Sequence, residues 1–341
     1  IQGRDIADFK DRSAPSVPII NHPDVRRMLL GMKAYVEGMR SLLYFVGMCD
    51  DRIHIADNDR DKAKYQGIID LLIPLAKGYV SDRAFDVCNL GVQVYGGYGY
   101  IKEYPMEQLL RDCRITPIYE GTNGIQAMDL LGRKLGLNKG KPIMDLMGEI
   151  QNTIAAAKAQ PKVDACADKV ETALNKLGEV ALHLGKTAMS AEVMTAFAHA
   201  YPFMEVSGDV VMSWLLLWRA TIAAEKLENG AKKKDVAFYE GQLKSAEFFV
   251  HSVLPVTLGK MDAILATNVA PVIVPIENMT VLAGTNLSFS VDATDPNGTM
   301  PSVRAENLPS GATFLPDLEG GGVFDWDIGL NQVGSYAPSF I

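Results

Sequence analysis

The sequence lacks several patterns that mark specialised classes of protein. Its four cysteines are scattered and form no CxxC pair, so their spacing predicts neither a zinc site nor a disulfide framework and favours a reducing compartment. A basic patch is also missing: the net charge is -8, and we therefore expect no nucleic-acid partner. The most apolar run, 210–224, is too short to cross a bilayer and is interrupted by polar residues. We interpret it as a buried helix, with contact to a membrane surface as the alternative.

The start of the chain has neither an initiator methionine nor a signal-peptide pattern. We therefore expect the sequence to be cut from a longer protein that works in the cytoplasm. The residues are 48% hydrophobic and 22% charged, which is normal for a globular protein, and 341 residues are enough for two or three domains.

Apolar residues recur at helical spacing through most of the chain. One apolar face runs from Val25 to Val46, and the stripe Met28–Met39 is its clearest part. A second helix is predicted from about 65 to 94, with a break or kink at Pro74. A further helix is expected to restart near Glu120. The pattern therefore predicts a bundle of helices in this part of the chain.

Beyond a linker at 138–142 the helical pattern resumes and continues to about residue 265, including a long apolar segment, Met194–Ala224. The last segment instead alternates at strand period, for example in 287–291 and 324–328, with turn signals between the runs. These changes predict three domains: a helical domain at 1–139, a second helical domain at 140–266 and an all-β domain at 267–341.

The stretch 93–126 concentrates residues that favour chemistry. It holds a glycine-rich turn at 96–99, an Arg111-Asp112 pair and a lone carboxylate in the turn Tyr119–Thr122. Each also has a plain structural interpretation: glycines permit positive φ, Arg-Asp pairs are usually solvated, and acids are favoured near a helix start. Their order and spacing together argue for more than structure.

This block resembles the C-terminal domain of acyl-CoA dehydrogenases, and within that family the bacterial subgroup that includes 3-methylmercaptopropionyl-CoA dehydrogenase. The matching elements stand here as Gln93-Val94-Tyr95-Gly96-Gly97-Tyr98-Gly99-Tyr100, Glu103-Tyr104-Pro105, Arg111-Asp112 and Ile118-Tyr119-Glu120-Gly121-Thr122. The resemblance implies a mainly α fold, with a four-helix bundle and an additional helical domain.

The resemblance also implies an activity, the FAD-dependent α,β-dehydrogenation of an acyl-CoA thioester. Glu120 would be the base that removes the α proton, and the flavin would accept the hydride because no side chain can. Residues implied to bind FAD are Gln93, Gly96, Gly97, Thr122 and Asn123. No metal site is expected.

In the family, an N-terminal helical domain and a middle β-domain complete the active site, so the resemblance implies that this chain is a C-terminal portion. The glycine turn would serve a cofactor held largely by a neighbouring subunit. We therefore expect a homo-oligomer, a dimer or tetramer, with the apolar stripes Met28–Met39 and Leu71–Leu90 as exposed interface. Electron-transfer flavoprotein would be the electron acceptor.

The last segment resembles the bacterial immunoglobulin-like repeats of surface proteins. The matching elements are Asn268-Val269-Ala270-Pro271, Thr294–Gly298, Leu308–Phe314, Phe324-Asp325-Trp326 and Gly334-Ser335-Tyr336. This resemblance implies a small all-β sandwich, possibly short of its final strand, and argues for a cell-surface or secreted context against the cytoplasmic expectation.

Two alternatives to a dehydrogenase stay open. One is a non-catalytic helical interaction module that carries an immunoglobulin-like adhesion domain, and the other is a flavin-dependent acyl-CoA oxidase. Bound flavin would separate the dehydrogenase from the module, and reactivity of the reduced flavin with oxygen would separate it from the oxidase.

Overall fold

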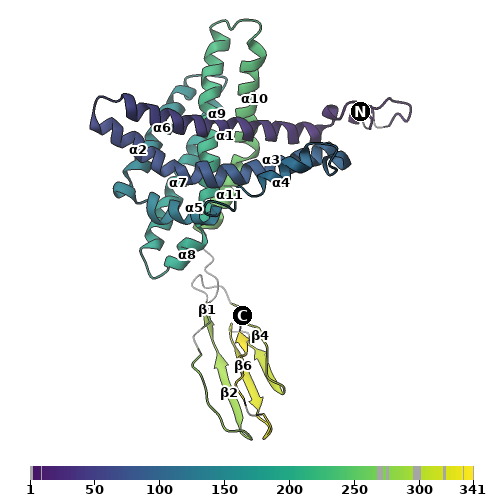
Figure 1. The fold of residues 1–341 in the computed structure, drawn as a ribbon, viewed down its shortest axis with the longest axis vertical. Helices are drawn as coiled ribbons and strands as arrows, with labels where there is room; N and C mark the ends of the chain where they lie inside the picture. Colours follow the sequence, from purple (N-terminus) through teal and green to yellow (C-terminus); the bar gives the residue numbers. More distant parts are fainter. Residues whose placement is uncertain are drawn as a thin grey trace. The chain divides into compact units, whose positions relative to one another are not determined.

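A computed structural model describes residues 3–8, 10–266, 272–273, 276–294, 301–317, 320–332 and 334–340. Its contacts divide the chain into two compact units, Ile1–Leu265 and Ala266–Ile341. The first unit is built of helices and the second of strands (Figure 1). The segment 267–271, where the composition changes from helix to strand pattern, lies outside the described residues.

The helical unit contains long helices joined by short 3-10 and π segments. The α-helices are α1 (Pro23–Ile55), α2 (Asp59–Pro74), α3 (Val80–Tyr95), α4 (Met106–Cys113), α5 (Asn123–Asp129), α6 (Lys141–Lys158), α7 (Asp164–Ala188), α8 (Val193–Ala198), α9 (Ala200–Glu228), α10 (Val236–Ser252) and α11 (Leu254–Leu265). The short segments are η1 (Ile6–Asp8), η2 (Ile19–Asn21), η3 (Leu75–Tyr79), η4 (Gly96–Gly99), η5 (Leu130–Lys134) and η6 (Leu137–Gly140).

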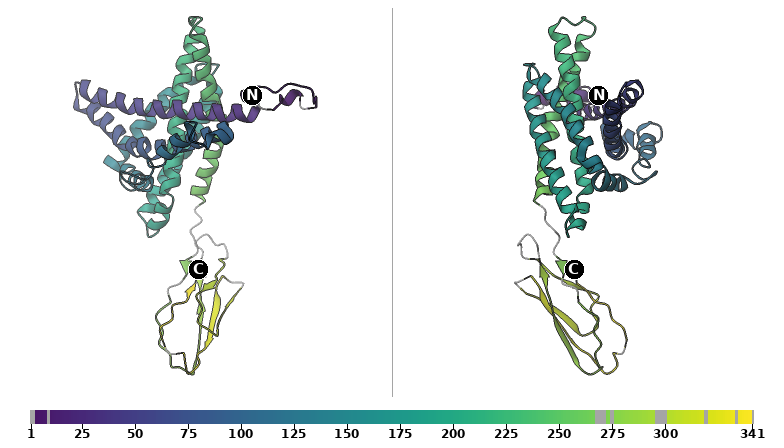
Figure 2. Two further views of the ribbon diagram at one scale, coloured as in Figure 1. Left: turned by 45° about the vertical axis from the view of Figure 1, so that its right-hand side comes forward. Right: turned by 90° about the vertical axis from the view of Figure 1, so that its left-hand side faces the viewer.

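Helix α9 is the centre of this unit. It packs against α1, α6, α7, α10 and α11, and buried side chains occur on all its sides (Figures 1 and 2). A helix that is apolar all round must be enclosed by others. The interpretation of 210–224 as a buried helix is therefore confirmed. The longer apolar segment Met194–Ala224 is divided, because its first residues belong to a separate short helix, α8.

One hydrophobic cluster extends from Ala34 in α1 to Ile264 in α11. Its aromatic centre contains Trp214, whose ring lies 4.9 Å from that of Phe45 and whose indole N–H donates to Thr153 at 2.8 Å. Helices before and after residue 140 thus share one core. The segments expected as two helical domains form a single compact unit.

By length and composition alone, one helical stretch in the described part of the chain, Val236–Leu265, could cross a membrane. The stretch is divided at Val253 between α10 and α11, and side chains such as Phe249, Leu254 and Met261 are buried in the cluster around α9.

At Pro74, where a kink or a break was predicted, the chain stays helical but the regular α-helix is interrupted by a π turn. The chain passes from α2 into a π segment, η3, where the N–H of Val80 bonds to the carbonyl of Leu75, five residues back. Proline cannot donate the backbone hydrogen bond of a regular helix, and its ring crowds the preceding turn. Single π turns inside helices are frequent at functional sites.

The β unit consists of short antiparallel strands. They are β1 (Val272–Ile273), β2 (Asn286–Val291), β3 (Ala293–Thr294), β4 (Ala305–Glu306), β5 (Ala312–Pro316), β6 (Gly322–Asp327) and β7 (Ser339–Phe340). The largest sheet has the order β2-β6-β5, and β1 pairs with β3 and β4 with β7.

Alternating side chains of β6 form the core of this unit. Phe324 and Trp326 are buried, and the Phe289 ring of β2 stacks on Phe324 with the ring centres 4.8 Å apart. The mainly α fold with a small β region is thus confirmed. That the β region is an immunoglobulin-like sandwich stays a prediction, and most of its Thr294–Gly298 element lies outside the described residues.

Candidate active site

Glu120 lies in the turn between α4 and α5, and its backbone is left-handed. Its φ is 53°, and that of Gly121 is 80°. A non-glycine residue in this region costs on the order of 1–3 kcal/mol and persists only where the surroundings hold it. The helix expected to restart near Glu120 therefore starts later, at Asn123, with Thr122 as its N-cap residue. Glu120 and Thr122 are both exposed to solvent.

Asn123 is buried beneath this turn, with 3% of its surface exposed. Its side-chain amide donates to the Gly78 carbonyl and to Ser81, each at 2.9 Å. Its side-chain oxygen accepts from Lys77 at 2.9 Å and from Ser81 at 3.3 Å. The hydrogen-bonding capacity of an Asn side chain is thereby used within the protein. In this structure the Asn123 side chain joins α5 to the π segment η3 and to Ser81.

The glycine turn ends α3, and its glycines differ in what they require. Gly96 has φ of 62°, which favours glycine. A Cβ on Gly99 would lie 2.4 Å from the Val92 carbonyl oxygen, so only glycine fits there. A Cβ on Gly97 would meet no atom within 4 Å. Gln93 is exposed on the last turn of α3, next to this open backbone.

The predicted site residues form two groups. Gln93, Gly96 and Gly97 lie at the C-terminal end of α3, whereas Asn123 bonds to Gly78 and Ser81 at its N-terminal end. With 1.5 Å per residue, the 16 residues of α3 separate the ends by about 24 Å. The described residues of one chain therefore do not gather the two groups into one pocket.

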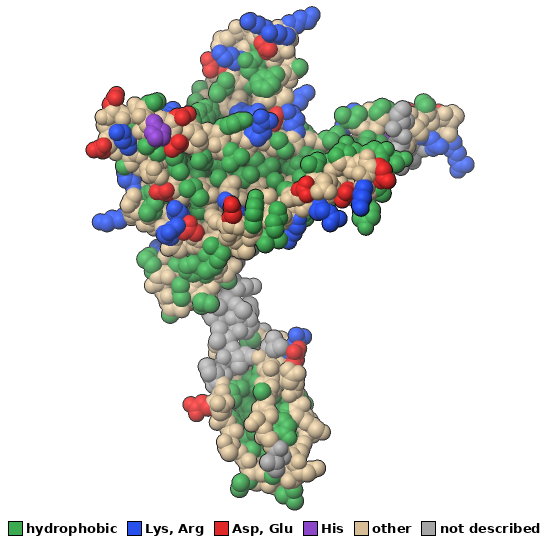
Figure 3. Space-filling model, viewed as in Figure 1, with side chains coloured by type: hydrophobic (Ala, Val, Ile, Leu, Met, Phe, Trp, Pro, Cys, Tyr) green, Lys and Arg blue, Asp and Glu red, His purple; other side chains and the backbone are tan. Residues whose placement is uncertain are grey.

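Exposed apolar side chains surround both groups. They are Tyr95, Tyr98, Tyr100, Ile101, Tyr104, Leu109, Ile115, Ile118, Tyr119, Ile125 and Met128. Figure 3 shows hydrophobic side chains at the surface of the helical unit. Exposed patches of this kind mark interaction surfaces.

The stripes predicted as interface, Met28–Met39 and Leu71–Leu90, are mainly covered by other helices of this chain. That prediction is wrong in its location, because periodicity shows that a helix face is apolar but not which element covers it. Within the helical unit, exposed large apolar side chains are densest along the sequence between Tyr95 and Met128.

Near the glycine turn, the surface is hollowed beside α4, over residues that include Lys102, Tyr104 and Arg111. The Arg111 and Asp112 side chains each turn to a neighbour on α4: Arg111 lies 3.8 Å from Glu107, and Gln108 donates to Asp112 at 2.6 Å. Their structural interpretation, a solvated pair of charges, is sufficient here.

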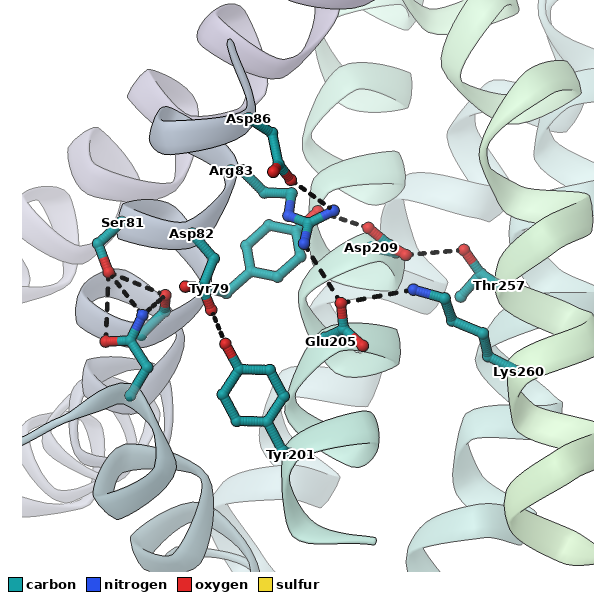
Figure 4. Close-up of polar contacts among 12 residues, drawn as sticks. Tyr79, Ser81, Asp82, Arg83, Asp86, Tyr201, Glu205, Asp209, Thr257 and Lys260 are labelled. Atoms are coloured by element: carbon teal, nitrogen blue, oxygen red, sulfur yellow. Dashed lines mark hydrogen bonds and ion pairs between the residues drawn. The ribbon is translucent and has the colours of Figure 1, made fainter. Parts of the chain in front are cut away.

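A polar network, buried at Tyr79, Asp209 and Thr257, connects η3 and α3 with α9 and α11 (Figure 4). The Tyr79 hydroxyl donates to one oxygen of Asp209 at 2.5 Å, and Thr257 donates to the other at 2.9 Å. Arg83 lies 3.2 Å from both Asp86 and Glu205. Sequence patterns did not predict this network, although Asp209 within so apolar a segment as α9 was a usable signal.

Burial governs the proton affinity of this network. It raises the pKa of Asp209, although the hydrogen bonds from Tyr79 and Thr257 oppose the rise. Burial also raises the pKa of Tyr79 well above its usual range, and the charge of Asp209 adds to the effect. Tyr79 therefore remains a protonated donor at neutral pH.

Asp209→Asn should change how the free energy of unfolding depends on pH, because the raised pKa of Asp209 links its protonation to folding. The folded protein binds the Asp209 proton more tightly than the unfolded chain, in which the pKa is near 3.8. The free energy of unfolding of the wild type, minus that of the variant, should therefore fall as pH rises through and above this value. It should become constant once Asp209 is ionised. Urea unfolding at a series of pH values measures the difference, and a difference that rises with pH would contradict the expected sign.

Two family models match the helical part of the chain. The model described as "Acyl-CoA dehydrogenase, C-terminal domain" matches residues 4–135, and "Acetyl-CoA dehydrogenase C-terminal like" matches 146–272. Two solved structures share the fold. An ACDH-11 of Caenorhabditis elegans in complex with C11-CoA has a TM-score of 0.56 at 19% identity, and covers 68% of this chain and 37% of its own. An acyl-CoA dehydrogenase of Bacillus anthracis complexed with FAD has a TM-score of 0.51 at 20% identity, and covers 75% and 47%.

Curated relatives agree. A broad-specificity linear acyl-CoA dehydrogenase of Mycobacterium tuberculosis is 32% identical over 77% of this chain and 44% of its own length. A butyryl-CoA dehydrogenase of Syntrophomonas wolfei is 35% identical over 78% and 44%. A 3-methylmercaptopropionyl-CoA dehydrogenase of Ruegeria pomeroyi is 37% identical over 70% and 40%. The chain thus spans less than half the length of these relatives. Its helical unit matches the C-terminal domains of the acyl-CoA dehydrogenase family.

Proposed function

We propose that this chain is the C-terminal part of an FAD-dependent acyl-CoA dehydrogenase in which Glu120 removes the α proton of an acyl-CoA thioester. The observation that carries the proposal is the Glu120 turn itself. The exposed Glu120 carboxylate lies on a left-handed turn, and the residues that follow it, Gly121 and Asn123, accept hydrogen bonds from Lys77. Strain of this kind is characteristic of functional sites.

The chemistry follows from the groups on this turn. The α proton of a thioester is weakly acidic, so its removal needs a base close by and an electrophile at the carbonyl oxygen. The Glu120 carboxylate supplies the base. The Glu120 backbone N–H has no acceptor among the residues that the structure describes, so it is available to polarise the thioester oxygen. FAD, when bound, supplies the hydride acceptor.

The residues at the glycine turn fit a flavin dinucleotide. Backbone at Gly96 and Gly97 is exposed, and the open space around their Cβ positions lets a ligand approach closely. Gln93 offers amide groups beside it, and Thr122 offers a hydroxyl at the other end of α3. Asn123 would act by holding the Glu120 turn, because its side chain is engaged inside the protein.

Because the two groups lie at opposite ends of α3, a complete site requires further protein, which we propose to be additional domains and a second copy of the chain. We also propose an acyl-CoA substrate, electron-transfer flavoprotein as acceptor and a cytoplasmic location. A shorter match supports the acceptor: a protein of Acetobacterium woodii, 32% identical over 37% of this chain and 30% of its own length, is named as a subunit of a caffeyl-CoA reductase-Etf complex.

A chimaera tests the proposed function. Residues 4–272 of this chain would replace the matching segment of the Mycobacterium tuberculosis relative, with the unaltered relative as control. We expect the chimaera to bind FAD and its flavin absorbance to bleach when acyl-CoA is added. A folded chimaera that binds FAD but shows no bleaching would favour the non-catalytic module. Rapid reoxidation by oxygen would favour the oxidase.

A further inference from the structure

Lys77 contacts the turn that carries Glu120. From the π segment η3, its ammonium group donates to the Gly121 carbonyl at 2.6 Å and to the Asn123 side-chain oxygen at 2.9 Å. Both acceptors lie within three residues of Glu120. Hydrogen bonds from a charged donor are roughly twice as strong as neutral ones, so this is a firm link between η3 and the turn.

The turn depends on such links. Glu120 and Gly121 are both left-handed, a conformation that the chain does not adopt by itself at Glu120. On the far side, the Asn123 N–H donates to the Pro117 carbonyl at 3.0 Å. Lys77 therefore helps to hold a turn whose left-handed backbone is unfavourable at Glu120.

The environment of Lys77 is unusual for a lysine. Among the residues that the structure describes, it forms no ion pair, and its partners are two neutral oxygens. This arrangement indicates that the lysine fixes a geometry.

Helix α9 fixes η3, and with it Lys77. The residue after Lys77 is Gly78, where a Cβ would lie 2.7 Å from the sulfur of Met204. The next is Tyr79, whose ring covers Gly208 and whose hydroxyl bonds to Asp209 (Figure 4). A π turn contains one residue more than an α-helical turn, and each residue of a helix corresponds to a rotation of about 100° about the helix axis. Contacts with α9 therefore set the direction from which Lys77 reaches the turn.

We propose that Lys77 is a positioning residue for the base, which holds the Glu120 turn through the Gly121 carbonyl, and that α9 orients Lys77 through η3. The catalytic part of this inference rests on the proposed function, whereas the structural part does not. It gives the helices beyond residue 140 a role in the site although they carry none of its predicted residues.

Amide hydrogen exchange of the full 341-residue chain tests the structural part. Lys77→Met, which keeps the aliphatic stem and removes the donor, should speed exchange of the Asn123 amide about tenfold by local opening. Lys77→Arg, which restores a charged donor, should return most of the protection. Lys64→Met is the matched control, since Lys64 on α2 pairs with Glu149 at 2.5 Å and does not touch the turn.

Unchanged exchange at Asn123 in Lys77→Met would overturn the proposal. So would an equal acceleration in Lys64→Met, or one that the change in global unfolding free energy, measured in urea, fully explains. In the chimaera, Lys77→Met should lower kcat at least tenfold with little change in KM, and Lys77→Arg should restore it. A chimaera that is inactive even with Lys77 present would count against the proposed function alone, because the exchange result does not depend on activity.

Discussion

Replacing Glu120 by Gln in the chimaera should lower the rate of α-proton exchange by at least about a hundredfold, the usual range for loss of a positioned base. Gln has the shape of Glu and the same backbone preferences, so the left-handed turn and its contact with Lys77 should persist. FAD should remain bound because the glycine turn is untouched. Incorporation of solvent deuterium into bound acyl-CoA, followed by mass spectrometry, measures the rate.

A second acid provides the control for this experiment. Glu171 on α7 pairs with Lys158 at 2.7 Å and lies outside the stretch 93–126, so the Glu171→Gln variant should catalyse α-proton exchange at the wild-type rate. If Glu120→Gln also retains near wild-type exchange, Glu120 is not the base.

Gly208→Ala should produce the largest loss of stability, about 3 kcal/mol in the free energy of unfolding. A Cβ there would lie 2.1 Å from a carbon of the Tyr79 ring, which is only 1% exposed. The ring has no room to move without breaking its hydroxyl bond to Asp209. Urea unfolding of wild type and variant gives the difference.

Gly241→Ala on α10 is the matched comparison. A Cβ on Gly241 would meet no atom within 4 Å, so the better helix propensity of Ala should raise the free energy of unfolding by up to about 1 kcal/mol. Replacing glycine by alanine should thus lower the free energy of unfolding at Gly208 and raise it at Gly241. Equal effects would mean that the contact between Tyr79 and α9 is not as close as described.

Local patterns predicted much of the fold. Pro74 marked the break between α2 and α3, Gly96 ended α3, and alternation around Phe289 and Phe324 identified β2 and β6. Each of these features depends on residues close together in sequence. The enclosure of α9 was also predictable, because a helix without a polar face has no other stable environment.

The details of the site depend on contacts distant in sequence, and periodicity does not report them. Glu120 was expected in a turn with a helix restarting near it, whereas a left-handed backbone at Glu120 and Gly121 delays the start of α5 to Asn123. Asn123 was expected to contact a cofactor, but Lys77, 46 residues earlier, occupies its side-chain oxygen. Lys77 reaches these groups from the π turn after Pro74, and this turn contacts α9 through Tyr79. The resemblance to a known family pointed to the Glu120 turn, and the structure shows the hydrogen bonds from Lys77 that hold it.

The exposed backbone at Gly97 can distinguish a structural need for glycine from a need imposed by a ligand. Since its φ is not left-handed and a Cβ there would touch nothing, the fold itself has no need of glycine at this position. If replacing Gly97 by alanine impairs the protein, the cause must be a ligand or another protein segment that approaches this backbone. Gly97 thus separates two requirements that coincide at Gly96: the left-handed backbone that the turn itself needs, and the open space that a ligand needs to approach the backbone.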